Sequence, residues 1–158
     1  MDEHKPIAIK GTSQPARVGS GYPDPFDKPC AERQKKPLGD AFSLSDYGVN
    51  LVTLPPGAWS SQRHWHSAED EFIYVLEGEP LLVTDEGETA LEPGMCAGFV
   101  AGDANGHHLV NSTDEVVVYL EVGSRRDEDD VDYSDIDMQV KRRGYGGVFT
   151  HKDGSPYN

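Results

Sequence analysis

Residues 63–78 read RHWHSAEDEFIYVLEG, and this stretch decides both the expected fold class and the expected chemistry. Side chains alternate between the two faces of a β-strand, so residues i and i+2 lie on one face, roughly 6.5 Å apart. His64 and His66 therefore point the same way, and both imidazoles can reach one metal ion. Glu71 begins the apolar run that follows, and Gly78 ends it. A carboxylate at the end of an apolar strand is costly unless a cation or hydrogen-bond donors neutralise it.

The pattern of short strands continues on both sides of this stretch. From Tyr47 onward, brief apolar or alternating segments each end at Gly, Pro, Asn or Asp. Such spacing is typical of an antiparallel sandwich or barrel. The step Asp85-Glu86-Gly87 between two of these segments predicts a hairpin. The segments read YGVNLVTL, QRHWHS, EFIYVLEG, PLLVTDEG, ETALEPG, MCAGFVAG, HHLVNS and EVVVYLEVG.

The two flanks of the chain differ from this central part in composition. Residues 1–40 are rich in Pro, Gly and charge, and we expect an extended N-terminal arm. The acidic stretch RRDEDDVDYSDIDMQ, residues 125–139, is typical of a solvated loop or a capped surface segment. The C-terminal GYGGVFTHKDGSPYN could form one more hairpin. The expected organisation is an arm (1–40), a barrel (41–124), and an acidic loop with a C-terminal extension packing on the barrel (125–158).

Charge and composition limit the classes of partner. A chain of 158 residues is expected to form one domain. Its formal charge of −14 disfavours binding to nucleic acid, and the prolines spread through the first 40 residues exclude a DNA-binding helix there. No signal peptide or membrane-spanning run is apparent, and Cys30 and Cys96 fit a reducing compartment. We therefore expect a soluble cytoplasmic protein that binds neither nucleic acid nor membrane.

A further ligand for the ion is expected from AGDANGHHLVNS. On a strand, His107 shares a face with Asn111, whereas His108 shares the opposite face with Val110. One histidine pointing inward would complete a set of three imidazoles and one carboxylate. Such a set suits Mn, Fe, Ni, Co or Zn and leaves coordination positions open for water, oxygen or a substrate.

These motifs together resemble those of the cupin superfamily over about residues 45–123. The resemblance implies metal ligands at His64, His66, Glu71 and His107. The spacing from histidine to Asn111 favours His107 over His108, although the gap from Gly102 to this histidine is longer than the family usually has. The first motif stands here as Gly57, His64, His66, Glu71 and Gly78, and the second as Gly87, Pro93, Gly94, Gly102, His107 and Asn111.

The resemblance also implies an architecture and an assembly. Cupins are all-β proteins with a jelly-roll-like antiparallel barrel, the double-stranded β-helix, and the metal lies inside one end. Many form homodimers through an outer sheet face or through exchanged N-terminal strands. The apolar outer residues Phe72, Tyr74 and Leu76, together with the long arm, fit a homodimer. The alternative is a monomer whose arm covers its own sheet.

The predicted site contains one divalent transition metal per chain, which could polarise a carbonyl, activate water or bind oxygen. We therefore predict a metal-dependent small-molecule enzyme with isomerase, lyase or dioxygenase chemistry. The alternative is a non-catalytic cupin that holds a metal and a small ligand for sensing or storage. Candidate proton-transfer residues are Glu77 and Tyr119, which could instead be a rim carboxylate and a core tyrosine.

Basic residues bear on the class of substrate. The chain looks similar to small single-domain bacterial cupins, some of which are labelled sugar-phosphate isomerases. Phosphorylated sugars usually need cationic side chains. Arg63 is the basic residue within the barrel segment, and it is predicted to face away from the metal. This shortage of positive charge favours a neutral or weakly charged ligand, unless basic residues after the last barrel strand fold over the opening: Arg125, Arg126, Lys141, Arg142 and Arg143.

Overall fold

The computed structural model describes residues 5–144 and 146–157, and its regular structure is mostly β-strand, which confirms the expected all-β class. Short 3₁₀ helices lie in the N-terminal part, at η1 (Gly11–Ser13), η2 (Lys28–Cys30) and η3 (Gly39–Phe42). The strands are β1 (Arg17–Val18), β2 (Gln34–Pro37), β3 (Tyr47–Leu54), β4 (His64–His66), β5 (Glu71–Glu77), β6 (Leu81–Thr84), β7 (Gly87–Ala90), β8 (Cys96–Phe99), β9 (His108–Val110), β10 (Val117–Ser124), β11 (Glu128–Tyr133), β12 (Gln139–Arg143) and β13 (Gly146–Thr150).

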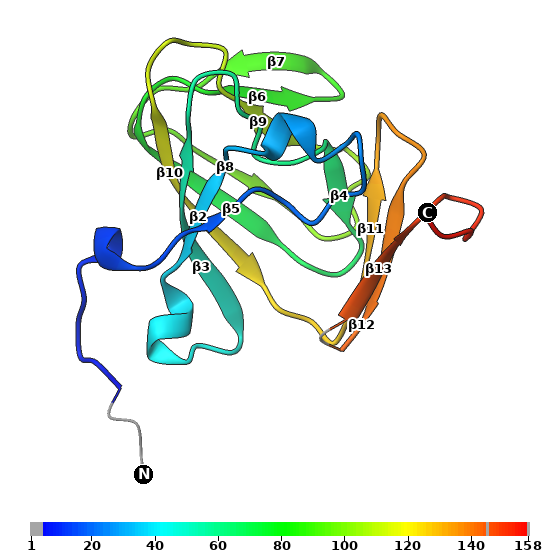
Figure 1. Cartoon of the computed structure of the whole chain (residues 1–158), viewed down its shortest axis with the longest axis horizontal. Coiled ribbons are helices and arrows are strands. Elements are labelled where there is room, and N and C mark those ends of the chain that lie inside the picture. The colour runs from blue at the N-terminus through cyan, green and yellow to red at the C-terminus, as the bar shows by residue number, and fades with distance from the viewer. Residues whose placement is uncertain (1–4, 145, 158) are drawn as a thin grey trace.

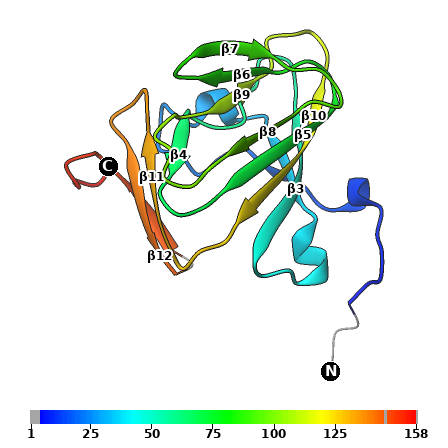
Figure 2. The same ribbon diagram turned by 180° about the vertical axis from the view of Figure 1, so that it is seen from behind.

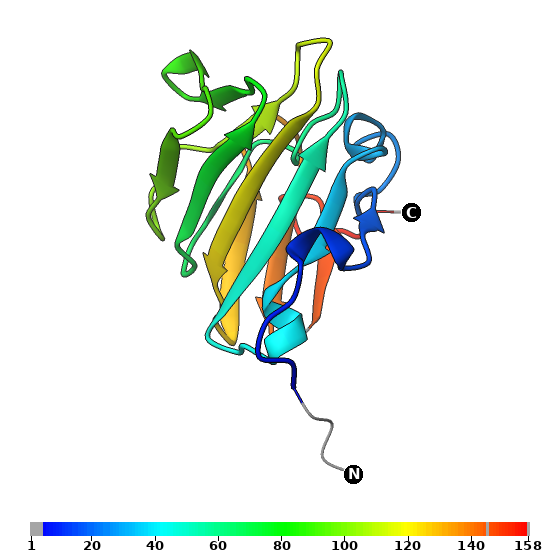
Figure 3. The same ribbon diagram turned by 90° about the vertical axis from the view of Figure 1, so that its left-hand side faces the viewer.

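The strands form antiparallel sheets that enclose a barrel. A six-stranded sheet has the order β1-β2-β3-β10-β5-β8, and a four-stranded sheet has the order β13-β12-β11-β4. The remaining sheet, β7-β6-β9, has three strands. In Figure 3 the six-stranded sheet lies in front of the C-terminal strands, so that the two form opposite walls (Figures 1 and 3). The jelly-roll-like barrel expected from the sequence is confirmed.

The main core lies between these walls. Alternate residues of each strand point into the barrel, and those of β3, β5 and β10 that form the core are mostly apolar. Tyr119, at 1% exposure, lies among branched aliphatic side chains on β10 and its neighbours. The expected hairpin at Asp85-Glu86 is also confirmed, since Thr84 pairs with Gly87 across a two-residue turn. The buried aliphatic residues of this core include Val52, Leu54, Ile73, Val75, Leu91, Leu109 and Val117.

The N-terminal arm adds strands to the edge of its own sheet. β2 pairs with β3 in the register Gln34↔Thr53, and β1 pairs with β2. The arm therefore leaves the outer face of β5 uncovered within this chain. Phe72, Tyr74 and Leu76 are 41%, 39% and 44% exposed on that face.

The acidic stretch was expected to be a solvated loop or a capped surface segment, and this prediction is wrong, because residues 128–133 form strand β11. β11 pairs with β12 on one side and with β4 on the other (Figure 2). Its alternate residues Asp129, Val131 and Tyr133 are buried. On the other face, Asp130 pairs with Arg143 and Asp132 with Lys152. The segment therefore forms a strand despite its high charge, because every second side chain is buried against the rest of the protein.

A second apolar cluster fixes the C-terminal strands to the arm. Val131, Tyr133 and Met138 are buried there, and Tyr22 and Phe26 of the arm pack against them. The Tyr22 and Tyr133 rings meet edge to face with centroids 5.5 Å apart. Among the described residues, no helix has the length and apolar character needed to cross a bilayer.

Candidate metal centre

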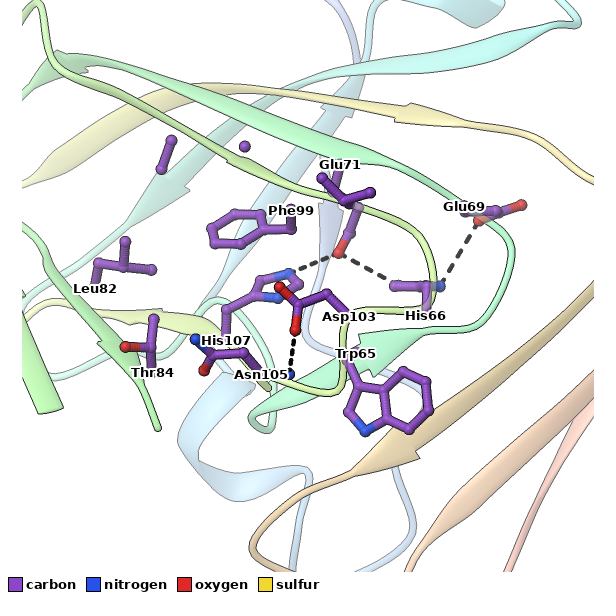
Figure 4. A pocket seen from close by; sticks show the side chains of 13 residues that line it. Trp65, His66, Glu69, Glu71, Leu82, Thr84, Phe99, Asp103, Asn105 and His107 are labelled. Carbon is purple, nitrogen blue, oxygen red and sulfur yellow. Dashed lines mark hydrogen bonds and ion pairs between the residues drawn. The ribbon is translucent and has the colours of Figure 1, made fainter. Parts of the chain in front are cut away.

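Three histidines converge on one carboxylate at an end of the barrel. His64 and His66 lie on β4, Glu71 begins β5, and His107 immediately precedes β9. Glu71 Oε2 lies 2.6 Å from Nε2 of His107, 3.5 Å from Nε2 of His66 and 3.7 Å from Nε2 of His64. Figure 4 shows Glu71 between His107 and His66. A backbone bridge between His64 and His107 holds these two segments together.

The spacing of these atoms suits a transition metal. Metal–nitrogen and metal–oxygen bonds of about 2.0–2.2 Å put neighbouring ligand atoms roughly 3.0–3.5 Å apart. The ligand atoms of His64, His66 and Glu71 all lie within 4.8 Å of one another. The 2.6 Å contact between His107 and Glu71 has the length of a charge-assisted hydrogen bond. Small movements of side chains therefore suffice for all four groups to share one ion.

The other ring nitrogens support the same function. His64 Nδ1 lies 2.8 Å from the Gln62 carbonyl oxygen, and His66 Nδ1 lies 2.7 Å from Asp129 Oδ2. Because these oxygens can only accept, both Nδ1 atoms donate, and Nε2 is the nitrogen that faces Glu71 and that would bind a metal once it carries no proton. The His107 ring stacks on Phe99 with centroids 3.6 Å apart, which fixes its plane. The three imidazoles are thus held in the tautomer or orientation that a metal ligand needs.

The protonation states reflect a buried carboxylate whose nearest neighbours are imidazoles. Burial alone would raise the pKa of Glu71, but the surrounding imidazoles of His107, His64 and His66 outweigh it and hold that pKa well below its usual range. Burial lowers the pKa of His107. For His66, burial is outweighed by the carboxylates of Asp129 and Glu71, which raise its pKa to about 10. In the absence of an ion, the His66 imidazolium thus supplies the positive charge that Glu71 requires.

The structure brings His107, and not His108, to this cluster. His108 is also buried, at 6% exposure, but its Nδ1 lies 2.8 Å from the Ser61 carbonyl oxygen. Its ring meets the edge of Trp59. The two adjacent histidines therefore point to opposite sides of the strand, as the alternation of side chains requires.

A second acidic group lies directly behind the histidines. His66, Glu69 and Asp129 place one donor atom each within 4.8 Å of one another. Arg142 forms an ion pair with Glu69, and its guanidinium lies 3.5 Å from Asp129 Oδ2. Because a cationic side chain already neutralises these carboxylates, we interpret this group as support for His66 and not as a second metal site.

Two cavities reach the cluster. One, of about 220 Å³, is lined by His66, Glu71 and His107 and by the apolar side chains of Leu82, Ala97 and Phe99; Figure 4 shows Phe99 beside His107. The other, of about 360 Å³, reaches His64, His66 and Glu71 and is far more charged. Its basic side chains are Arg17, Arg33, Lys35, Arg125 and Arg142. The expectation that positive charge is scarce near the site is therefore wrong. Arg125 and Arg142, two of the residues that the sequence offered as cover for the opening, do line the cavity, and the N-terminal arm supplies the other three cations.

Most of these cations are already paired. Lys35 lies 2.8 Å from Glu121, and Arg125 lies 2.9 Å from Asp40. Arg33 differs, since its guanidinium donates to the carbonyl oxygens of Ser60 at 2.6 Å and Gly19 at 2.7 Å. Within the described residues, no carboxylate lies within ion-pair distance of Arg33. Its charge is therefore available to an anionic ligand.

The other residues singled out in the sequence lie elsewhere. Glu77 is exposed and borders a surface hollow with Gly78 and Val116, in which none of the three histidines takes part. Tyr119 is buried in the core, and burial raises the pKa of its hydroxyl well above its usual range. Cys96 is an exposed free thiol. Arg63 faces away from the histidines as predicted, because its guanidinium binds Asp135.

Sequence reasoning missed Asp129 and the basic residues of the arm. Asp129 alternates with Val131 and Tyr133, a period-2 pattern that the surrounding acidic residues obscured. Arg33 and Lys35 carry no local signal, because only the pairing of β2 with β3 brings them to the cavity.

Comparisons with known proteins bear on the family of this chain. A family model described as a cupin domain matches residues 50–123. The solved structure of a sugar phosphate isomerase from a cupin superfamily, from Silicibacter pomeroyi, is 48% identical, covers 96% of each chain and has a TM-score of 0.91. This chain belongs to the cupin superfamily. A candidate sugar phosphate isomerase from Acidithiobacillus ferrooxidans is 31% identical over 81% of each chain, with a TM-score of 0.73.

A more distant solved structure shows a likeness of fold alone. A polyketide cyclase from Streptomyces resistomycificus is 21% identical, with coverage of 74% of this chain and 78% of the cyclase and a TM-score of 0.61. No curated protein matched the sequence.

Proposed function

We propose that this cupin is a metal-dependent isomerase of a phosphorylated sugar. His64, His66, Glu71 and His107 would hold one divalent transition metal, chosen among Mn, Fe, Ni, Co and Zn. The observation that carries the proposal is the convergence of three imidazole Nε2 atoms on Glu71 Oε2, next to a cavity lined by cations. The similarity to two proteins described as sugar phosphate isomerases supports the same reaction class.

Different groups of the cavity would bind the two ends of such a substrate, the carbonyl end and the phosphate end. A bound metal supplies Lewis-acid polarisation of a carbonyl or hydroxyl oxygen. Arg33 offers a guanidinium that has no carboxylate partner in the described part of the chain, and a planar guanidinium matches the oxygens of a phosphate. The Ser60 and Ser61 side chains lie in the same cavity and can donate to an oxyanion. The cavity of about 360 Å³ is of the size expected for a small-molecule site.

The partners and location are proposed on similar grounds. A small-molecule substrate fits the cavities, and we propose a homodimer through the exposed face of β5. The unpaired thiols of Cys30 and Cys96 support a cytoplasmic location.

The proposal is tested with protein loaded anaerobically with each metal in turn. Erythrose 4-phosphate, ribose 5-phosphate and glucose 6-phosphate are incubated with each form, and conversion to the ketose is followed by NMR. We expect conversion of at least one aldose phosphate, and loss of conversion in His64→Ala. Tight binding of a ligand without turnover by any metal form would favour a binding protein instead. Oxygen consumption by the Fe(II) form would indicate dioxygenase chemistry.

A further inference from the structure

Glu121 occupies a position inside the charged cavity that the metal centre does not use. On β10 the inward-facing residues are Val117, Tyr119 and Glu121, and the first two belong to the apolar core. Glu121 pairs with Ile73 of β5, whereas Glu71 pairs with Gly123. The two glutamates are therefore diagonal neighbours on adjacent strands, which places their Cα atoms about 7–8 Å apart. Both glutamates line the charged cavity of about 360 Å³.

The residue opposite Glu71 keeps that space open. Gly123 lines the same cavity, and a Cβ at this position would lie 3.9 Å from Glu71 Cγ. The side chain of Glu121 is 21% exposed, so one part of it faces the cavity. Glu121 therefore borders the opening through which a ligand would approach the histidines.

One oxygen of Glu121 is held and the other is free. Lys35 Nζ donates to Glu121 Oε2 at 2.8 Å, and Asn50 Nδ2 donates to the same oxygen at 3.0 Å. Within residues 5–144 and 146–157, no hydrogen bond reaches Oε1. Two donors on Oε2 fix the carboxylate plane and leave Oε1 available to a ligand. Although burial opposes ionisation, the charge of Lys35 outweighs it and lowers the pKa of Glu121, so the carboxylate is ionised at neutral pH.

The other carboxylates of the cavity are engaged. Asp40 has both oxygens on arginines, Oδ1 with Arg125 and Oδ2 with Arg17. Glu69 Oε1 accepts hydrogen bonds from Arg142 and from the Arg126 backbone, and its Oε2 lies 3.9 Å from His66 Nδ1. Glu71 is surrounded by the histidines. Outside the metal cluster, Glu121 is thus the cavity carboxylate best able to accept a proton from a substrate carbon.

We propose that Glu121 is the proton-transferring catalytic residue of this cupin, and that Lys35 and Asn50 are its positioning residues. The inference rests on the proposed isomerase function. Glu121 Oε1 removes the proton from the carbon next to the carbonyl; the C–H electron pair becomes a carbon–carbon double bond, and the carbonyl pair moves onto oxygen. Glu121 returns the proton to the former carbonyl carbon, and the hydroxyl proton passes between the two oxygens. No oxidant or other reactant is consumed.

The first experiment compares Glu121→Gln with Glu88→Gln, which changes an exposed strand carboxylate. General base catalysis contributes about 10²–10⁴-fold, so we expect kcat of Glu121→Gln to fall by at least about 100-fold. Metal content per chain and KM stay near those of the wild type, and Glu88→Gln retains its activity. In D₂O the wild type introduces deuterium next to the carbonyl, and Glu121→Gln does not. Activity or exchange equal to the wild type in Glu121→Gln would overturn the assignment.

Lys35→Met tests the positioning role. Since Lys35 lowers the pKa of Glu121, its removal raises that pKa, and the acidic limb of the kcat/KM profile should move to higher pH. An acidic limb that does not move would contradict the role of Lys35.

A labelling experiment does not depend on turnover. Glycidol phosphate carries both a phosphate and an epoxide that esterifies a nearby carboxylate. We expect mass spectrometry to find the adduct on Glu121, with protection by inorganic phosphate, and no adduct at this position in Glu121→Gln. If the wild type converts no aldose phosphate, the proposed function fails, and the label alone decides where the reactive carboxylate lies. Adducts on other carboxylates without modification of Glu121 would overturn the inference.

Discussion

At the scale of single residues, the account depends on which atoms face Glu71. Asp129 fixes His66 by accepting from its Nδ1 at 2.7 Å. Replacing such a partner of a metal ligand usually costs about 10–100-fold in metal affinity. We expect Asp129→Asn to lower affinity by this factor, measured by competition with a chromogenic chelator. Asp130→Asn is the matched control, because Asp130 lies on the other face of β11 and pairs with Arg143. Equal affinities of the two variants would contradict the role of Asp129.

The two adjacent histidines give a second prediction at this scale. His107 Nε2 lies 2.6 Å from Glu71, whereas His108 binds the Ser61 carbonyl oxygen. His107→Ala should therefore weaken metal binding by more than about 100-fold, which exceeds the usual effect of losing a residue that only hydrogen-bonds to a metal ligand. His108→Ala removes a buried ring and should lower thermal stability with little change in metal affinity. The reverse order of affinities would mean that His108 supplies the ligand.

At the scale of elements, the N-terminal arm contributes function through its strands. β2 carries Lys35 to the cavity, and Arg33 precedes this strand. A hydrogen bond to a charged group is worth about 1.5–3 kcal/mol, so Arg33→Met should raise KM for an aldose phosphate by about 10–100-fold. Because the phosphate lies away from the reacting carbons, kcat should change little.

Arg143→Met is the control for the loss of an arginine, because Arg143 on β12 is half exposed and pairs with Asp130. Steady-state kinetics of both variants show whether KM for the aldose phosphate rises in Arg33→Met alone. If KM is unchanged in Arg33→Met, the phosphate lies elsewhere in the cavity.

The pairing of strands that lie far apart in the sequence could not be predicted from the sequence alone. The spacing of His64 and His66 predicted their common face, since alternation along a strand is local. The sequence analysis did not predict strand β11, because the many acidic residues of this segment indicated a solvated loop and concealed the alternation of buried and exposed positions. Its burial depends on pairing with β4, which lies far away in the sequence. Lys35 and Glu121 meet for the same reason, through the neighbouring strands β2, β3 and β10.

At the scale of the whole molecule, the exposed face of β5 bears on assembly. Phe72, Tyr74 and Leu76 present a continuous apolar surface, because they alternate along one strand. We expect light scattering to give twice the mass of one chain, and Leu76→Glu to give a monomer. Val148→Glu, at a 69% exposed position of β13, should leave the dimer intact. A wild-type monomer would contradict the expected homodimer.

The barrel as a whole serves to bring β4, β5 and the segment before β9 to one point. The sequence separation of these segments means that only the correctly closed fold creates the cluster. The cluster in turn explains why a buried carboxylate is tolerated at the start of β5, where burial would otherwise raise its pKa.

The most direct measurement is elemental analysis of protein purified without added ions and without a nickel column. Convergence of four side chains on one cation predicts about one divalent transition metal per wild-type chain, and almost none in the His64→Ala/His66→Ala double variant. A folded wild-type protein that contains no such metal and takes none up on dialysis, or a double variant with unchanged metal content, would contradict it.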